Sequence, residues 1–165
     1  MKLEAGQVAV VTGAANGIGE ALARAVSERG LRVVPADLEG ERITEVAAGL
    51  DGEAMAMPTD VSDAGQVQRL ADAALDRFGR IDLAVNNAGV GRGGPSWQVG
   101  TEDWQRVLAV NLGGVVNGIR AFVPAMVEAG RGHIVNTASV VGLTASPFAI
   151  RERIDHVIAD FEASR

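Results

Sequence analysis

A glycine-rich turn near the N-terminus constrains the fold more than any other stretch of this chain. An apolar run over residues 8–11 leads into glycines at positions 13, 17 and 19, and a helical pattern of apolar residues follows from Ala21. A strand, a tight turn and a helix in this order are the context that a dinucleotide-binding loop requires. Such a turn presents backbone N–H groups and the positive end of a helix dipole to a pyrophosphate.

The three glycines have separate expected roles. Gly13 adopts the backbone angles of a sharp turn, Gly17 lets the main chain approach a pyrophosphate, and Gly19 lets the helix pack close to its strand. Their spacing differs from the common G-x-G-x-x-G pattern, and glycine turns after strands also occur without a ligand. A Walker-A phosphate loop is excluded because no Gly-Lys-Ser or Gly-Lys-Thr follows.

Composition limits the kinds of protein that this chain can be. The 165 residues are 47% apolar, which predicts one folded domain over residues 1–165. The net charge of −6, with acids and bases interspersed, argues against nucleic-acid binding. No uninterrupted apolar run of membrane-spanning length and no signal peptide is visible, so we expect no membrane association and a cytoplasmic location. The absence of cysteine and two separated histidines predict no metal site.

Strand and helix patterns alternate along the chain and predict an α/β fold. A parallel sheet with helices on both faces and right-handed crossovers follows from this alternation. The strands are expected at residues 8–11, 31–36, 54–57, 81–85 and 133–137. A long helix opens at Thr101, with Pro124 expected to bend its later part. Its inward residues are expected to be Trp104, Val107, Leu108, Leu112, Val115, Val116, Ile119 and Val123.

Polar residues stand where the predicted strands end, and ligands bind at that edge of a parallel sheet. Asp37 closes the second strand, 18 residues after Gly19. A carboxylate there accepts hydrogen bonds from both ribose hydroxyls of an adenosine and repels a 2′-phosphate, which favours NAD over NADP. Arg42 is close enough to soften this preference. The alternative is an acidic residue that only starts a turn.

Taken together, five motifs resemble the short-chain dehydrogenase/reductase family, over residues 6–150. They are Thr12–Gly19, Asp60-Val61, Asn86–Gly89, Asn111 and the run at 134–139 that ends in Ser139. The resemblance implies a Rossmann-like, doubly wound sheet of five parallel strands in the order 3-2-1-4-5. It also implies hydride transfer between NAD(H) and a small alcohol or ketone. A methyltransferase-like protein would also use an acid after the second strand, but it does not explain the fourth and fifth strand ends.

The resemblance assigns roles to individual positions. Asp60 is expected to hydrogen-bond the adenine amino group, with Val61 beside the ring. The catalytic set is expected to keep Asn111, which holds a water of a proton relay, and Ser139, which orients the substrate carbonyl. Without a ligand, Asn111 would be a helix-kink residue bonded to a neighbouring backbone and Ser139 a turn residue. The implied cofactor-binding residues are Gly13, Asn16, Gly17, Ile18, Gly19, Asp37, Asp60, Val61, Asn87, Ala88 and Gly89.

The chain departs from the family where the catalytic tyrosine and lysine are expected. It has no tyrosine, and its only lysine is Lys2. Glu152 and His156 stand at the corresponding distance after Ser139, but neither side chain reproduces the reach of a phenol. The chain as written is therefore predicted to be inactive.

The resemblance stops at Arg151, where an amphipathic C-terminal helix over residues 151–165 is predicted. We expect a discontinuity between Ile150 and Arg151, either a true deletion or an omitted stretch. If the missing segment is present, the protein is an ordinary enzyme and is expected to be a homo-oligomer. If it is absent, the fifth strand is left as an apolar edge. The alternative function is then a non-catalytic NAD-binding or interaction module. Residues 91–100 and 140–148 are expected to line an apolar substrate pocket.

Overall fold

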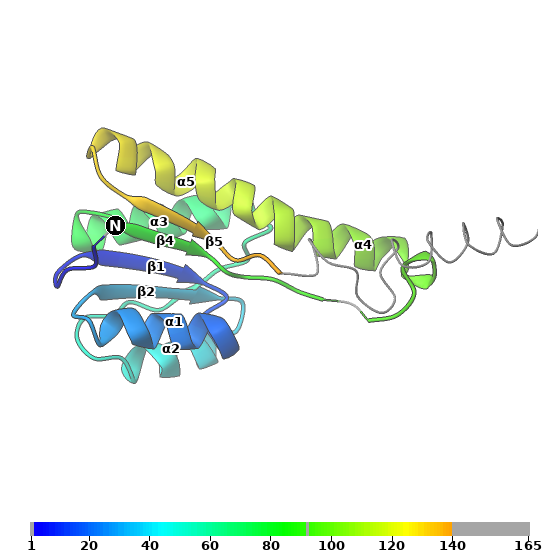
Figure 1. Ribbon diagram of the computed structural model, residues 1–165, viewed down its shortest axis with the longest axis horizontal. Helices are drawn as coiled ribbons and strands as arrows, with labels where there is room; N and C mark the ends of the chain where they lie inside the picture. The colour runs from blue at the N-terminus through cyan, green and yellow to red at the C-terminus, as the bar shows by residue number, and fades with distance from the viewer. Residues whose placement is uncertain (1, 92, 140–165) are drawn as a thin grey trace, which may run out of the picture.

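The computed structural model describes residues 2–91 and 93–139, and it confirms a parallel sheet of five strands in the order β3-β2-β1-β4-β5. Figure 1 shows the strands side by side with their carboxyl ends at one edge. Their bounds are β1 Val8–Thr12, β2 Arg32–Asp37, β3 Met57–Pro58, β4 Leu83–Asn86 and β5 His133–Asn136. The third strand differs most from its predicted span, because Ala54 makes only an isolated bridge to Val33.

Helices cover both faces of the sheet, as predicted. Helices α1 (Gly17–Ser27) and α2 (Gly40–Ala48) pack on one face, and α3 (Ala64–Phe78) and α5 (Gly114–Glu128) pack on the other (Figure 1). The order of strands reverses at β1, so right-handed crossovers place the two pairs on opposite faces. The C-terminal helix, the predicted discontinuity, Glu152, His156 and the pocket stretch 140–148 lie outside the described residues.

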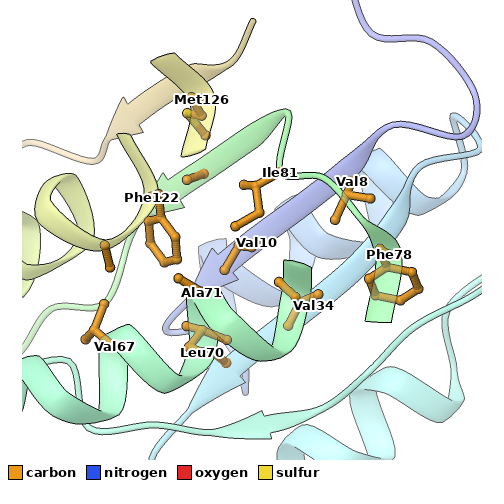
Figure 2. Packing of buried hydrophobic residues seen from close by; sticks show 14 of the residues in the cluster. Val8, Val10, Val34, Val67, Leu70, Ala71, Phe78, Ile81, Phe122 and Met126 are labelled. Atoms are coloured by element: carbon orange, nitrogen blue, oxygen red, sulfur yellow. The ribbon is translucent and has the colours of Figure 1, made fainter. Parts of the chain in front are cut away.

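Alternate residues of the buried strands fill two separate cores. Along β1, Val8 and Val10 face α3 and α5, where they share a cluster with Leu70 and Phe122 (Figure 2). The next residue along, Ala9, belongs to the cluster on the other face. Both faces of a parallel sheet are buried, which explains why its strands read as continuous apolar runs.

Helix α3 has a capped first turn and ends at a glycine. Asp63 caps the first turn, because its carboxylate accepts hydrogen bonds from the amides of Gly65 and Gln66. Gly79 follows the last turn with φ +72°, the left-handed conformation that favours glycine.

The prediction of which side of the long helix faces the sheet is wrong. None of its eight predicted residues is buried, and Leu108 and Leu112 are 53% and 61% exposed. The sheet instead receives the side of α5 that carries Gly118, Phe122 and Met126. Glycine allows the backbone of α5 to approach β4 closely, whereas the larger β-branched and leucine side chains turn outward.

The long helix is irregular around Asn111, and the bend expected at Pro124 stays a prediction. It begins as α4 (Thr101–Leu108), passes through a π-helical turn, η2 (Ala109–Gly113), and continues as α5 through Pro124 up to Glu128. A short 3₁₀ helix, η1 (Ser96–Gln98), precedes it. Figure 1 shows α4 projecting beyond the carboxyl edge of the sheet.

Residues 101–128 together form a helix that is long and apolar enough to cross a membrane by length and composition. Isolated charges interrupt the apolar run of this helix without removing its average hydropathy, and the expectation of no membrane association stays a prediction. This length and composition are weak evidence for a membrane span, since an amphipathic helix of an α/β domain meets the same test.

Asp82 joins the amino ends of three strands. Its carboxylate is buried and accepts the Val8 amide at 2.8 Å, and it also accepts hydrogen bonds from Nε and Nη2 of Arg80 at 2.7 and 2.6 Å. Arg131 lies 3.4 Å from it. Burial raises the pKa of Asp82, but the hydrogen bonds from Arg80 and Val8 outweigh burial and leave the pKa below its ordinary value.

Asp82→Asn is expected to lower the free energy of unfolding by about 2 kcal/mol at neutral pH, because it weakens charge-assisted hydrogen bonds to a buried group. The lowered pKa means that this stabilisation is present above about pH 5 and is lost as the pH falls through the folded-state pKa. Urea unfolding of both proteins between pH 7 and 3 checks this, with Asp72→Asn at an exposed position of helix α3 as control. An equal loss of unfolding free energy in both variants would contradict the role of Asp82.

Gly118→Ala is expected to destabilise the protein by about 1–3 kcal/mol, because an added Cβ would overlap the side-chain amide of Asn86. Gly113→Ala is the matched control in the same long helix, because its nearest neighbour would lie at an ordinary 3.7 Å. Alanine favours helix over glycine by about 1 kcal/mol, so the control is expected to be neutral or stabilising in thermal melts. Equal melting temperatures would contradict the close packing of α5 on β4.

Candidate cofactor site

Close packing requires two of the three predicted glycines. Gly13 has φ +66°, and an added Cβ would come within 2.6 Å of the Cα of Ala88. An added Cβ on Gly19 would overlap the carbonyl oxygen of Gly13. Gly17 also has a positive φ, of +55°, but no atom lies within 4 Å of the position of its absent Cβ. Gly17 therefore faces open space, as a residue against a ligand would.

The N-terminus of α1 is open in the way that an anion site requires. Asn16 stands at the N-cap but its side chain makes no capping hydrogen bond. The amides of Gly17 and Ile18 have no hydrogen-bond partner among the described residues, and the Ile18 side chain is 66% exposed. Unpaired amides at the positive end of a helix attract phosphate oxygens, so the turn fits a pyrophosphate.

Thr12 and Asn87 connect this turn to the loop after β4. The Thr12 hydroxyl accepts hydrogen bonds from the amides of Asn87 and Ala88 at 3.0 and 3.2 Å, and it donates to the carbonyl of Val85. The Asn87 side chain donates to the carbonyls of Thr12 and Gly13. Thr137, just past β5, donates to the other end of the Asn87 amide. The ends of β1, β4 and β5 are thereby held together.

Asp37 lies at the end of β2, beside the glycine turn. Its carboxylate accepts the Ala15 amide at 3.0 Å and the Glu39 amide at 3.4 Å. Arg42 of α2 donates to the carbonyl of the same Ala15 at 3.0 Å. The acid and the base therefore hold opposite ends of one residue of the turn.

Asp60 and Val61 follow β3 and adopt a tight turn. One oxygen of Asp60 accepts from both the amide and the hydroxyl of Ser62, and Gln66 accepts the Asp60 amide. The second carboxylate oxygen of Asp60 has no hydrogen-bond partner in the part of the chain that the structure describes. It can therefore accept from an amino group of a ligand.

Residues at the ends of several strands line one cavity of about 360 Å³. Six predicted cofactor residues line it: Gly13, Asp37, Asp60, Val61, Ala88 and Gly89. Its other lining residues are Leu38, Thr59, Ser62, Val90, Arg106, Ala109 and Val110. Sequence reasoning missed Leu38, although an apolar residue directly after a strand-end acid was a usable signal. It also missed Arg106, which nothing distinguishes from other charges on an amphipathic helix.

Asn111 lies in the π-helical turn, and its side chain makes two hydrogen bonds to the backbone of Val90. It accepts the Val90 amide at 2.8 Å and donates to the Val90 carbonyl at 2.9 Å. This contact matches the interpretation of Asn111 as an irregular-helix residue bonded to neighbouring backbone. Ser139 is exposed and lies three residues beyond β5, at the carboxyl edge. The two catalytic assignments stay predictions.

The arrangement favours an elongated, partly anionic ligand. Carboxylates at Asp37 and Asp60 accept from hydroxyl and amino groups, the apolar side chains of Leu38 and Val61 offer a surface for a flat ring, and the open turn accepts phosphate. A second cavity of about 260 Å³, lined by Val90, Gly91, Asp103, Arg106 and Val107, adjoins the predicted substrate stretch 91–100.

Comparison with known proteins gives a consistent result. A family model described as "short chain dehydrogenase" matches residues 7–150. A D-threitol dehydrogenase of Mycolicibacterium smegmatis is 45% identical over 85% of this chain and 55% of its own length. A meso-2,3-butanediol dehydrogenase of Serratia marcescens is 44% identical over 83% of this chain and 55% of its own length. The chain spans about half the length of these relatives.

Two solved structures share the fold. A short-chain dehydrogenase/reductase from Burkholderia phymatum, in complex with NAD, has a TM-score of 0.84 and 43% identity, covering 88% of this chain and 53% of its own. A metagenomic short-chain oxidoreductase in complex with NADP has a TM-score of 0.77 and 42% identity, covering 84% of this chain and 64% of its own. With the family model, the relatives and the sheet order in agreement, the chain belongs to the short-chain dehydrogenase/reductase family.

Proposed function

We propose that this chain is the cofactor-binding part of an oxidoreductase that transfers hydride between NAD(H) and a small alcohol or ketone. The observation that carries the proposal is the single cavity lined by Gly13, Asp37 and Asp60, beside an uncapped helix N-terminus. A dinucleotide needs these three chemistries along its length: a phosphate cradle, a ribose acceptor and an adenine acceptor.

Each part of the cradle has a distinct proposed task. The amides of Gly17 and Ile18 bind the pyrophosphate, Asp37 accepts the ribose hydroxyls, and Asp60 accepts the adenine amino group beside Val61. Asn16, Gly19, Asn87, Ala88 and Gly89 shape the turn and the strand end. Bound NAD supplies the hydride acceptor, and Asn111 and Ser139 position the water and the substrate carbonyl.

NAD is the proposed cofactor in preference to NADP. The Asp37 carboxylate would repel a 2′-phosphate, and it is held by the Ala15 amide at the edge of the cavity. The family itself does not decide this point, because one similar structure holds NAD and another holds NADP. Two relatives are named as dehydrogenases of threitol and butanediol, and these names support a small alcohol as substrate.

The second candidate function is a non-catalytic NAD-binding or interaction module. It is favoured by the absence of tyrosine from the 165 residues and by a family match that ends at residue 150. We propose a discontinuity between Ile150 and Arg151 on the same grounds. An oligomer of the complete protein and its cytoplasmic location stay predictions.

Asp37→Ala is expected to weaken NADH binding about tenfold, because two hydrogen bonds to a charged acceptor are lost. NADPH binding is expected to weaken less or to improve, since the repulsion of its phosphate is removed. Titration of NADH and NADPH fluorescence checks both, with Asp51→Ala at the opposite edge of the sheet as control. Unchanged NADH affinity, or equal affinity for the two cofactors in the parent, contradicts the assignment of Asp37.

The 165 residues alone are expected to bind NADH without oxidising it in the presence of ketones or diketones, because a family tyrosine and lysine are not among them. Intact mass of the protein from its source organism distinguishes the two functions. A mass of 17.1 kDa supports the module, and a mass several kDa greater supports the enzyme. Turnover by the 165-residue chain itself would contradict its predicted inactivity and would rule out the non-catalytic module.

A further inference from the structure

The side chain of Arg42 is held by three protein groups, although it is 41% exposed. Its Nε donates to the carbonyl of Ala15 at 3.0 Å, one arm pairs with Glu20 at 2.8 Å, and the other pairs with Glu45 at 3.1 Å. Each of the three guanidinium nitrogens therefore has an acceptor. The guanidinium is held against the glycine turn and is not part of the cavity lining.

Glu20 is the centre of this cluster. It lies on the first turn of α1, its side chain is 18% exposed, and it accepts Arg24 with one oxygen and Arg42 with the other. The Arg24 hydrogen bond and both positive charges hold the pKa of Glu20 below its ordinary value against partial burial. Glu20 is thus ionised at neutral pH and binds Arg42 as a charged group.

The position of Arg42 relative to Asp37 gives this cluster a consequence for cofactor choice. Asp37 accepts the amide of Ala15, while Arg42 donates to the carbonyl of that residue. Arg42 and Asp37 therefore bind opposite ends of the same residue, and Asp37 is the proposed acceptor of the ribose hydroxyls. An arginine at this edge of the sheet is the kind of group that receives a 2′-phosphate when it is free to do so.

We propose that Glu20, assisted by Glu45, is a positioning residue for cofactor selectivity: it holds Arg42 on the glycine turn and so withholds it from the 2′-phosphate of NADP(H). This inference rests on the proposed function, because it requires the ribose of a dinucleotide to lie at Asp37. Selection against NADP(H) then has two sources, a carboxylate that repels the phosphate and an ion-pair cluster that restrains the cation.

The test measures NADPH and NADH affinity in an Asp37→Ser background, where the direct repulsion is gone. Adding Glu20→Gln is expected to strengthen NADPH binding about five- to tenfold, because Arg42 gains a charge-assisted bond to phosphate. NADH binding is expected to change by less than about twofold. Adding Arg42→Ala as a third change is expected to abolish the gain.

Glu41→Gln is the matched control, because it removes the same charge from an exposed position beside Arg42 on α2. An equal NADPH gain in this control, no gain with Glu20→Gln, or a gain that persists after Arg42→Ala would each overturn the inference. If Glu20→Gln unfolds the chain, exposed Glu45→Gln decides by the same comparisons, with a smaller expected gain. Failure of the parent to bind NADH would instead overturn the proposed function.

Discussion

The hydrogen bonds of the Thr12 hydroxyl are the contact on which the rest of the site depends. A parallel sheet brings its strand ends to one edge, but it does not fix how the loops beyond that edge lie. Thr12 fixes them, because its hydroxyl binds the amides of Asn87 and Ala88 and thereby joins the glycine turn to the loop after β4. Gly13 can then lie directly against Ala88, which only a residue without a Cβ permits.

Polar groups around this edge divide into two sets. Thr12, Asn87, Arg42 and Asn111 use their hydrogen-bonding groups on protein atoms, and they determine the shape of the loops. The second oxygen of Asp60 and the amides at the start of α1 face open space. The groups bound to protein atoms keep the loops rigid, and the groups that face open space are available to a ligand. Such a site needs little reorganisation when the ligand binds, which preserves affinity.

The parts of the fold that the sequence predicted correctly are set by local chemistry. The positive φ of Gly13 and the alternation of strands and helices are each determined within a few residues. The strand order followed from the resemblance to a family, not from these signals. Asp37 and Asp60 were predicted at the site because strand ends of a parallel sheet necessarily share one edge.

The errors arose where contacts between distant segments decide the outcome. The long helix is apolar around much of its circumference, so periodicity could not tell which side packs on the sheet; the close fit of Gly118 against Asn86 decides it. The π-helical turn depends on a contact of Asn111 with Val90, 21 residues earlier in the chain. The Arg42 cluster likewise joins two separate helices, so the position of Arg42 in the sequence does not reveal that Glu20 binds it.

The outward side of the long helix affects how the protein behaves in solution. Residues 107–119 contain no charged side chain, whereas the net charge of −6 is carried elsewhere on the molecule. Like-charge repulsion therefore gives that side little protection, and exposed Leu108, Leu112 and Val116 dominate it. Self-association through it would strengthen in sulfate, as apolar burial does, where an association driven by ion pairs would weaken as salt is added.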